Sequence, residues 1–210
     1  MRRTSPSTPP LRSPTGYDPE AGTLTVVCKV VGAGTAELAE MLPGQSCNVM
    51  GPLGKGYPTP CSDETPILVA GGYGSAAILP LAKRSPNKGM LLLGARSAKD
   101  VLERELFEQV GRVLITTEDG SEGEKGFVTN HSVLAQEHFD RISTCGPKPM
   151  MMAVARYAFK NDIECEVSLE NKMACGVGAC LCCVEKTVEG NKCVCKEGPV
   201  MNIKKLTWQI

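Results

Sequence analysis

Four short apolar segments recur through the middle of the chain, and stretches of helical periodicity lie next to them. Strands are predicted at Ile67–Ala70, Met90–Leu93, Val113–Thr116 and Arg141–Thr144. Helices are predicted at about residues 75–84, 98–110, 131–138 and 148–160. Continuous apolar strands that alternate with helices are typical of a parallel sheet covered on both faces. We therefore expect an α/β domain over residues 63–164.

The pattern before this domain is weaker. The β-branched residues 23–31 predict a strand, Ala36–Met41 predicts a short helical turn, and Ser46–Met50 predicts a second strand. These elements indicate a small antiparallel unit over residues 17–62. Residues 1–16 are rich in Pro, Ser, Thr and Arg and have few apolar side chains, so we expect them to be disordered or poorly packed.

The pattern changes again after the α/β domain. Residues 165–210 are rich in glycine and hold seven of the eleven cysteines. An odd number of cysteines, in a chain whose start lacks the apolar core of a secretory signal, disfavours a disulfide scaffold and favours metal or redox chemistry. We therefore expect a cytoplasmic protein whose cysteines carry a function.

Charge excludes some classes of partner. The chain has 23 Lys and Arg against 23 Asp and Glu, so its net charge is zero. Nucleic acids and anionic membranes attract proteins with a basic excess, and we therefore expect neither as the main partner. No apolar run approaches the roughly 20 residues that a membrane-spanning helix needs.

The most specific motif is a set of cysteines with the spacing C-x4-C-x2-C, followed by a further cysteine. The four are Cys175, Cys180, Cys183 and Cys195. This is the spacing of plant-type [2Fe–2S] ferredoxins, in which three thiolates on one loop and a fourth from a later segment hold the cluster. Gly176 and Gly178 allow the loop to turn tightly and to direct N–H groups at the sulfurs.

Two further cysteines leave alternatives open. On paper Cys182 and Cys193 could each replace a ligand, although only Cys183 gives the x2 spacing after Cys180, and spacing alone favours Cys195 over Cys193 only weakly. A zinc ribbon is the other metal site to consider, but it needs two CxxC knuckles, and Cys193-x-Cys195 makes a poor second one. The remaining cysteines are expected to be small buried residues, namely Cys28, Cys47, Cys61 and Cys165.

Glycine-rich turns follow three of the predicted strands. Val69-Ala70-Gly71-Gly72-Tyr73-Gly74 joins a strand to a helix, Gly94–Ser97 follows the next strand, and Cys145-Gly146-Pro147 follows the last one. All three turns fall at the carboxyl ends of parallel strands, where open α/β sheets bind their ligands. We therefore expect a nucleotide site there, with Cys145 either packed behind it or lining it.

Classical side-chain catalysis has little support in the sequence. His131 and His138, the two histidines, lie on a predicted surface helix and are expected to be solvated. Glu118-Asp119-Gly120 is better explained as a turn than as an acid–base pair. We find no Ser-His-Asp or paired-carboxylate arrangement, so no catalytic side chain is predicted.

At these motifs the chain resembles the electron transfer subunits of dihydroorotate dehydrogenase B, in the ferredoxin–NADP reductase superfamily. The resemblance is carried by Ile67–Gly74, Gly94–Ser97, Thr117–Thr129, Cys145–Met150, Ser168–Cys175 and Cys195–Val200. It implies three modules: a flavin-binding antiparallel β-barrel, an α/β domain that binds NAD, and a [2Fe–2S] domain over residues 165–210. It also supports Cys195 as the fourth cluster ligand.

The resemblance also implies flavin contacts in the amino-terminal unit. It maps them onto Val27, Cys28 and Lys29 and onto Gly34 and Thr35, whose amides and hydroxyl would meet the FAD pyrophosphate. It maps nucleotide contacts onto Gly71, Gly72, Gly74, Cys145 and Gly146.

One motif departs from the family. Its Arg-Pro-x-Ser strand falls on Pro10–Ser13, where only Ser13 matches, and two or more upstream strands are missing. The absent arginine would remove a charge-assisted contact to the flavin phosphate. We therefore expect a truncated barrel, and FAD is the one cofactor whose binding this sequence does not firmly predict.

The implied function is electron transfer in pyrimidine biosynthesis. Electrons would pass between NAD, FAD, the [2Fe–2S] cluster and an FMN-containing catalytic subunit that oxidises dihydroorotate, in a complex of two subunits of each kind. We expect NAD rather than NADP, although Lys83, Arg84 and Arg96 could favour a 2′-phosphate. The alternatives are a subunit of another NAD(P)H-dependent oxidoreductase, a non-enzymatic zinc module, and an inactive fragment without FAD.

Overall fold

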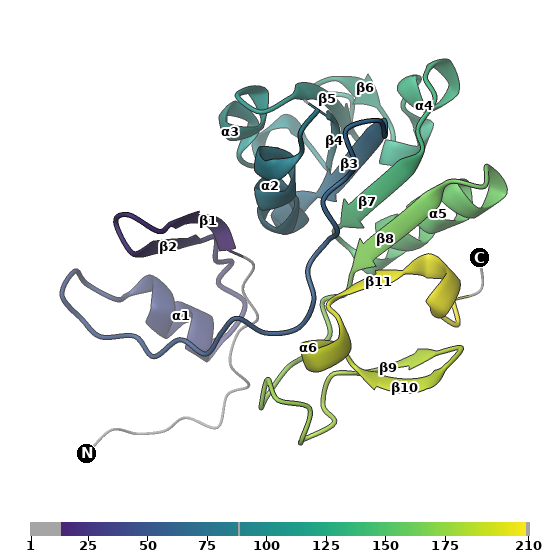
Figure 1. Ribbon diagram of the computed structural model, residues 1–210. Helices are drawn as coiled ribbons and strands as arrows, with labels where there is room; N and C mark the ends of the chain where they lie inside the picture. The colour runs from purple at the N-terminus through teal and green to yellow at the C-terminus, as the bar shows by residue number, and fades with distance from the viewer. Residues whose placement is uncertain (1–13, 88, 209–210) are drawn as a thin grey trace.

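The computed structural model describes residues 14–87 and 89–208, and a seven-stranded sheet forms its centre (Figure 1). The strand order is β11-β8-β7-β3-β4-β5-β6, and every pair is parallel except β11 with β8. The strands are β3 (Pro66–Gly71), β4 (Met90–Ala95), β5 (Arg112–Thr117), β6 (Glu124–Lys125), β7 (Arg141–Cys145), β8 (Glu164–Ser168) and β11 (Val200–Asn202). The four strands that the apolar pattern predicts are therefore confirmed.

The sheet is buried on both faces because its apolar residues face both ways. Ile67 and Val69 of β3 pack on one side with α5 (Lys148–Lys160), whereas Leu68 and Ala70 pack on the other with α2 (Ser75–Arg84). The α3 helix (Arg104–Glu108) adds Phe107, which has no exposed surface, to the α2 side. The continuous apolar runs of the sequence reflect this two-sided burial.

The predicted helices were correct in two places and too long in two others. The α2 and α5 helices have the predicted bounds. The expected helix 98–110 is divided into η2 (Ala98–Asp100) and α3, because Glu103 between them has the left-handed φ of 58°. The expected helix 131–138 is reduced to α4 (Val133–Gln136), which follows η3 (Val128–Asn130).

The amino-terminal unit contains less regular structure than the sequence predicts. The hairpin of β1 (Pro14–Asp18) and β2 (Thr23–Val26) is followed by α1 (Ala33–Ala39), while residues 27–31 and 46–50 form no strand. The expectation of disorder was wrong for residues 14–16, which belong to β1; residues 1–13 lie outside the described part. Within that part the unit has two strands, so a barrel remains a prediction.

The carboxyl-terminal residues are tied to the central sheet. The β8 strand crosses the expected boundary at residue 165, and β11 returns to pair with it. Between them lie the cysteine loop, the hairpin of β9 (Val184–Thr187) and β10 (Gly190–Cys193), and α6 (Val194–Glu197); η4 (Ile203–Lys205) follows β11. In Figure 1 this yellow-green region lies beside β8.

Three smaller expectations were wrong. His131 is 8% exposed rather than solvated, and its Nδ1 accepts a hydrogen bond from the backbone N–H of Val133 at 3.1 Å. Cys47 and Cys61 are exposed rather than buried. The expectation of burial is confirmed for Cys165, which has no exposed surface.

Candidate functional site

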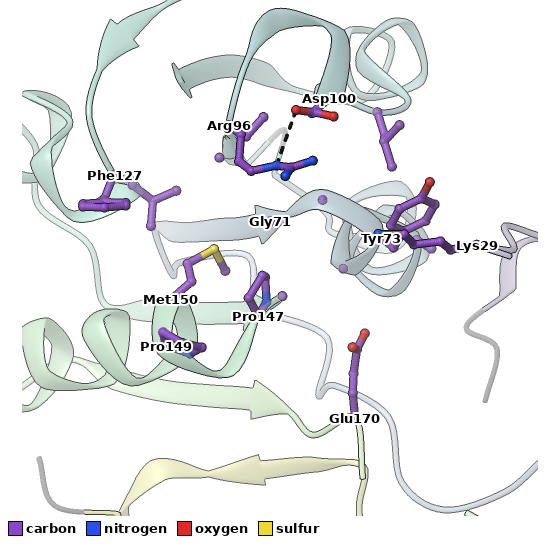
Figure 2. Close-up of a pocket in the computed structure, with 18 of the residues that line it drawn as sticks. Lys29, Gly71, Tyr73, Arg96, Asp100, Phe127, Pro147, Pro149, Met150 and Glu170 are labelled. Carbon is purple, nitrogen blue, oxygen red and sulfur yellow. Dashed lines mark ion pairs between the residues drawn. The ribbon is translucent and has the colours of Figure 1, made fainter. Parts of the chain in front are cut away.

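A large cavity opens at the carboxyl ends of β3, β4, β5 and β7. Its volume is about 1440 Å³, and the turns that follow these strands form its walls (Figure 2). Four basic side chains line it, namely Lys29, Arg96, Lys99 and Lys172. A cavity of this size with backbone turns and cations at its walls suits a nucleotide with its phosphates.

The glycines of the β3–α2 turn permit close packing at the cavity wall. A Cβ on Gly74 would overlap the backbone carbonyl of Cys145, and a Cβ on Gly71 would strike the Met150 side chain. Gly72 has the left-handed φ of 52°. Only glycine therefore allows this turn to lie against the turn that follows β7.

The cavity includes some of the predicted cofactor residues. Lining residues among them are Gly71, Gly72, Gly74, Gly146, Val27 and Lys29. Neither Cys28 nor Cys145 lines the cavity, although each adjoins a residue that does.

The other flavin candidates lie elsewhere. Gly34 and Thr35 belong to α1, outside the cavity. The Thr35 hydroxyl accepts hydrogen bonds from the N–H groups of Val31 and Gly32, at 2.8 and 3.1 Å, and donates to the Gly32 carbonyl at 2.8 Å. Its hydrogen bonds are thus formed within its own turn. Ser13 lies outside the described residues.

Cys145 and Glu170 form a contact at the edge of the cavity. The Cys145 Sγ lies 3.9 Å from the Ser168 carbonyl and 3.9 Å from Oε1 of Glu170. Burial raises the pKa of the Cys145 thiol to about 12, so the group is a neutral thiol near neutral pH. Desolvation also raises the pKa of Glu170, whose carboxyl faces the cavity (Figure 2).

Sequence reasoning assigned no role to several lining residues. They include Tyr73, Asp100, Thr116, Glu118, Phe127, Met150 and Glu170. The Thr116 hydroxyl is buried, and no partner for it is found among the described residues. Thr116 and Glu118 lie at the carboxyl end of β5, and that position could have pointed to them. Glu170 reaches the cavity because its segment packs beside Cys145, which is distant in sequence, so no local pattern predicts it.

The cysteine loop has a backbone that aims N–H groups at sulfur. Gly176 and Gly178 have φ values of 71° and 79°, and Leu181 has the left-handed φ of 56°. The Cys180 N–H donates to the Cys175 Sγ at 3.4 Å. This bond and others from the loop backbone lower the pKa of Cys175 to about 6, which favours the thiolate that a metal binds.

The four predicted ligands form two pairs. Cys175 and Cys180 are the outer pair, whose side chains interact on the exposed loop. Cys183 and Cys195 are the inner pair; both are buried, and the Cys195 N–H donates to the Cys183 Sγ at 3.3 Å. Within residues 14–87 and 89–208, no three His, Cys, Asp or Glu side chains are arranged around one metal ion. Two pairs of thiols fit the two irons of a [2Fe–2S] cluster better than a single tetrahedral zinc.

One backbone segment connects the cavity to the cysteine loop. Glu170, Asn171, Lys172 and Met173 line the cavity, and Cys175 follows two residues later. The side chains of Leu53 and Met50 pack against the loop, since a Cβ on Gly176 would come within 2.8 Å of Leu53 and 3.2 Å of Met50. The segment of Leu53 is itself tied to the carboxyl-terminal region, where the Val200 N–H donates to the Lys55 carbonyl at 3.3 Å.

Comparison with known proteins agrees with this arrangement. Residues 170–207 match the family model of the iron–sulfur cluster binding domain of dihydroorotate dehydrogenase B. An electron transfer subunit of dihydroorotate dehydrogenase B (NAD⁺) from Clostridium perfringens is 41% identical over 180 residues, which cover 84% of this chain and 72% of the relative. This chain belongs to that family of electron transfer subunits. The Bacillus pumilus subunit is 37% identical over 210 residues, with 95% of this chain and 81% of the relative covered.

A solved structure extends the comparison to the whole fold. An NADH-dependent reduced ferredoxin–NADP oxidoreductase, described for flavin-based electron bifurcation, has a TM-score of 0.84 and 31% identity, with 94% of this chain and 73% of that chain covered. A ferredoxin reductase of carbazole 1,9a-dioxygenase, at a TM-score of 0.53 and 18% identity, shares the fold alone.

The family and the fold together support an oxidoreductase subunit with [2Fe–2S] and FAD as cofactors and NAD as substrate. Among the described helices, none has the length and apolar character to cross a bilayer.

Proposed function

We propose that this chain carries electrons between NAD and a separate subunit that oxidises dihydroorotate. The observation that supports this most directly is the shared segment from Glu170 to Cys175, which lines the nucleotide cavity and then enters the cysteine loop. Electron transfer between two cofactors requires them to lie close together, and this segment keeps both sites next to each other. The proposed cluster ligands are Cys175, Cys180, Cys183 and Cys195.

The cofactors would supply the redox chemistry, and the chain's residues would position them. A bound FAD would supply hydride exchange with NAD and single-electron exchange with the cluster. The turns at Gly71–Gly74 and Gly146 would hold nucleotide phosphates against backbone N–H groups, assisted by Lys29 and Arg96. Val27 and Lys29 are the flavin candidates that line the cavity, and they would form its amino-terminal wall.

Charge at the cavity wall favours NAD over NADP. Glu118 lines the cavity at the end of β5, where its carboxylate would repel a 2′-phosphate. Arg96 is paired with Asp100 at 3.7 Å, and Arg84 donates to the Tyr57 carbonyl at 2.8 Å, away from the cavity. The variant Glu118→Arg should raise kcat/KM for NADPH about tenfold relative to NADH; an unchanged ratio would contradict the assignment.

The proposed partner is a catalytic subunit that contains FMN, in a complex of two catalytic and two electron transfer subunits. The relatives are named as electron transfer subunits, and such a subunit needs a catalytic one. We propose the cytoplasm as the compartment, since none of the eleven cysteines, all within the described residues, forms a disulfide, as is usual in a reducing environment.

The proposal is tested by producing the chain anaerobically, alone and with the dihydroorotate-oxidising subunit. We expect a coloured protein with iron, sulfide and FAD, a stable complex with that subunit, and NAD⁺ reduction that depends on dihydroorotate and on both chains. Light scattering would give the stoichiometry. A colourless protein that contains zinc, or a complex without orotate-linked activity, would contradict the proposal.

A second candidate function is electron transfer to a different oxidoreductase. The 31% identity to an NADH-dependent ferredoxin–NADP oxidoreductase favours it. Ferredoxin-dependent NAD(P)H oxidation, together with failure to bind a dihydroorotate-oxidising subunit, would support this alternative over the first.

A further inference from the structure

A fifth thiol lies against the cysteine loop. Cys193 is the last residue of β10, and its Sγ lies 3.7 Å from the carbonyl oxygen of Gly178, to which the thiol donates. Gly178 stands in the loop between Cys175 and Cys180. The Cβ of Cys193 is 3.8 Å from the point where a Gly178 side chain would begin. The Cys193 side chain is therefore packed on the loop that carries the outer pair of ligands.

Cys193 is also held next to the inner pair. In the β9–β10 hairpin it lies opposite Val184, the residue that follows Cys183. The Val194 N–H donates to the Cys183 carbonyl at 3.2 Å, and the Cys195 N–H donates to the Cys183 Sγ at 3.3 Å. These two bonds hold residues 193–195 around Cys183, so thiols at both ends of this tripeptide flank the same ligand.

Cys193 and Cys195 both lie next to the segment of Cys183. Cys193 contacts the Gly178 carbonyl and pairs with Val184, whereas the Cys195 N–H donates to the Cys183 sulfur. The two candidates differ in burial, because Cys195 is 1% exposed whereas Cys193 is half-buried. The buried thiol is the better resident ligand, and the more accessible one is the better candidate for an alternative ligand.

We propose that Cys193 is an alternative fourth ligand of the cluster, able to bind the iron held by Cys183 when Cys195 does not. The inference rests on the proposed cluster. In the exchange, the Cys193 thiol releases its proton to solvent and forms a sulfur–iron bond, while the bond from Cys195 breaks and its sulfur takes up a proton. No electron is transferred. The exchange requires only a local shift, because the two thiols lie at the ends of one tripeptide that is hydrogen-bonded to Cys183.

Cys182 provides a matched control. It is also a spare cysteine next to a ligand, but it is exposed, and the structure gives it no hydrogen bond within the described residues. If any nearby thiol could replace Cys195, Cys182 would serve as well as Cys193. If the replacement depends on where the thiol lies, only Cys193 will replace Cys195.

The test uses the full chain, reconstituted anaerobically, in three variants: Cys195→Ala, Cys193→Ala/Cys195→Ala and Cys182→Ala/Cys195→Ala. We expect the first and third to retain wild-type amounts of iron and sulfide, with a shifted visible and EPR spectrum. The second should retain about tenfold less. Circular dichroism shows whether alanine at 195 prevents folding. If it does, the same series is made with Cys195→Ser, which preserves the packing. The decisive result is then loss of the shifted thiolate spectrum when Cys193→Ala is added.

Two results would overturn the inference. Complete loss of the cluster from folded Cys195→Ala would overturn this inference but not the proposed function, since the wild-type chain would still hold its cluster. Equal retention in the Cys193→Ala and Cys182→Ala double variants would also overturn it. A wild-type chain that assembles no cluster would instead overturn the proposed function together with this inference.

Discussion

The central sheet and the cysteine loop follow one another in the chain, yet they obtain their shapes in different ways. In the sheet, Leu92 and Ile67 have no exposed surface, and helices cover both faces. In the loop, residues 174–182 form no helix or strand, none is buried, and three of them have a positive φ.

Burial can stabilise the sheet, but it cannot stabilise this loop. A non-glycine residue with a left-handed backbone persists only where its surroundings hold it, and Leu181 adopts this conformation at a cost of order 1 kcal/mol. A bound cluster would supply that constraint, since metal binding free energy is also folding free energy. The difference implies that damage to the sheet spreads through the molecule, whereas damage to the loop stays local.

The largest expected effect is loss of the cluster from Cys183→Ala. Cys183 is 2% exposed and is the proposed ligand around which residues 193–195 are held. We expect iron and sulfide to fall below about a tenth of wild type, with hydrogen exchange rising in residues 174–182 but not in β3, β4 or β5. Mass spectrometry of exchange and visible absorption measure both effects.

The neighbouring Cys182→Ala is the control for this variant, and it should keep the cluster. If Cys183→Ala loses protection from hydrogen exchange equally in the sheet and in the loop, the two regions unfold together, and the prediction is wrong.

The converse variant is Leu92→Ala, at the centre of β4. Removing a buried leucine side chain leaves a cavity, and we expect the free energy of unfolding to fall by about 2–5 kcal/mol. The folded variant should keep the visible spectrum of the cluster. Urea unfolding followed by circular dichroism measures the change. Leu106→Ala, at a side chain that is 39% exposed, should cost much less, and a similar loss there would argue that burial is not the cause.

The same contrast explains what the sequence could predict. Strands such as Ile67–Ala70 were recoverable because two-sided burial leaves a continuous apolar run. The iron–sulfur domain could be predicted because cluster geometry restricts the spacing of cysteines, whereas the individual ligands remain a prediction. Local patterns do not record where Glu103 breaks a helix, nor that Glu170 reaches the cavity to meet Cys145. Those features depend on contacts between segments distant in sequence.

Gly74→Ala tests the cavity wall at the β3–α2 turn. Its new Cβ would overlap the Cys145 carbonyl, so the β3–α2 turn must shift. We expect the Kd for NADH to rise about tenfold or more, because small displacements of a binding turn are costly, while the cluster spectrum stays unchanged. Fluorescence titration with NADH gives the affinity.

Gly89→Ala is the control. Gly89 precedes the amino end of β4, away from the cavity, and a Cβ there would make only ordinary contacts, at 3.6 Å. Equal affinities in the two variants would mean that the turn at Gly74 does not contact the nucleotide.

The smallest expected effect is a pH dependence from His131. Burial lowers the pKa of His131 below its ordinary value near 6.5; Arg112 lowers it further, and Glu124, at 3.5 Å, opposes the shift. As the pH falls below 6.5, the unfolded chain takes up a proton that the native histidine resists, since its Nδ1 accepts the Val133 N–H. Stability is therefore fully present above this pH and declines below it.

His131→Asn retains a hydrogen-bond acceptor without the titration, so its loss of stability between pH 7 and pH 5 should be shallower than in wild type. Urea unfolding at a series of pH values measures the slopes. His138→Asn, at an exposed side chain paired with Asp140, should leave the wild-type slope intact. If the slope instead flattens in His138→Asn and not in His131→Asn, the acid sensitivity would belong to the surface pair, and the buried histidine next to the sheet would not cause it.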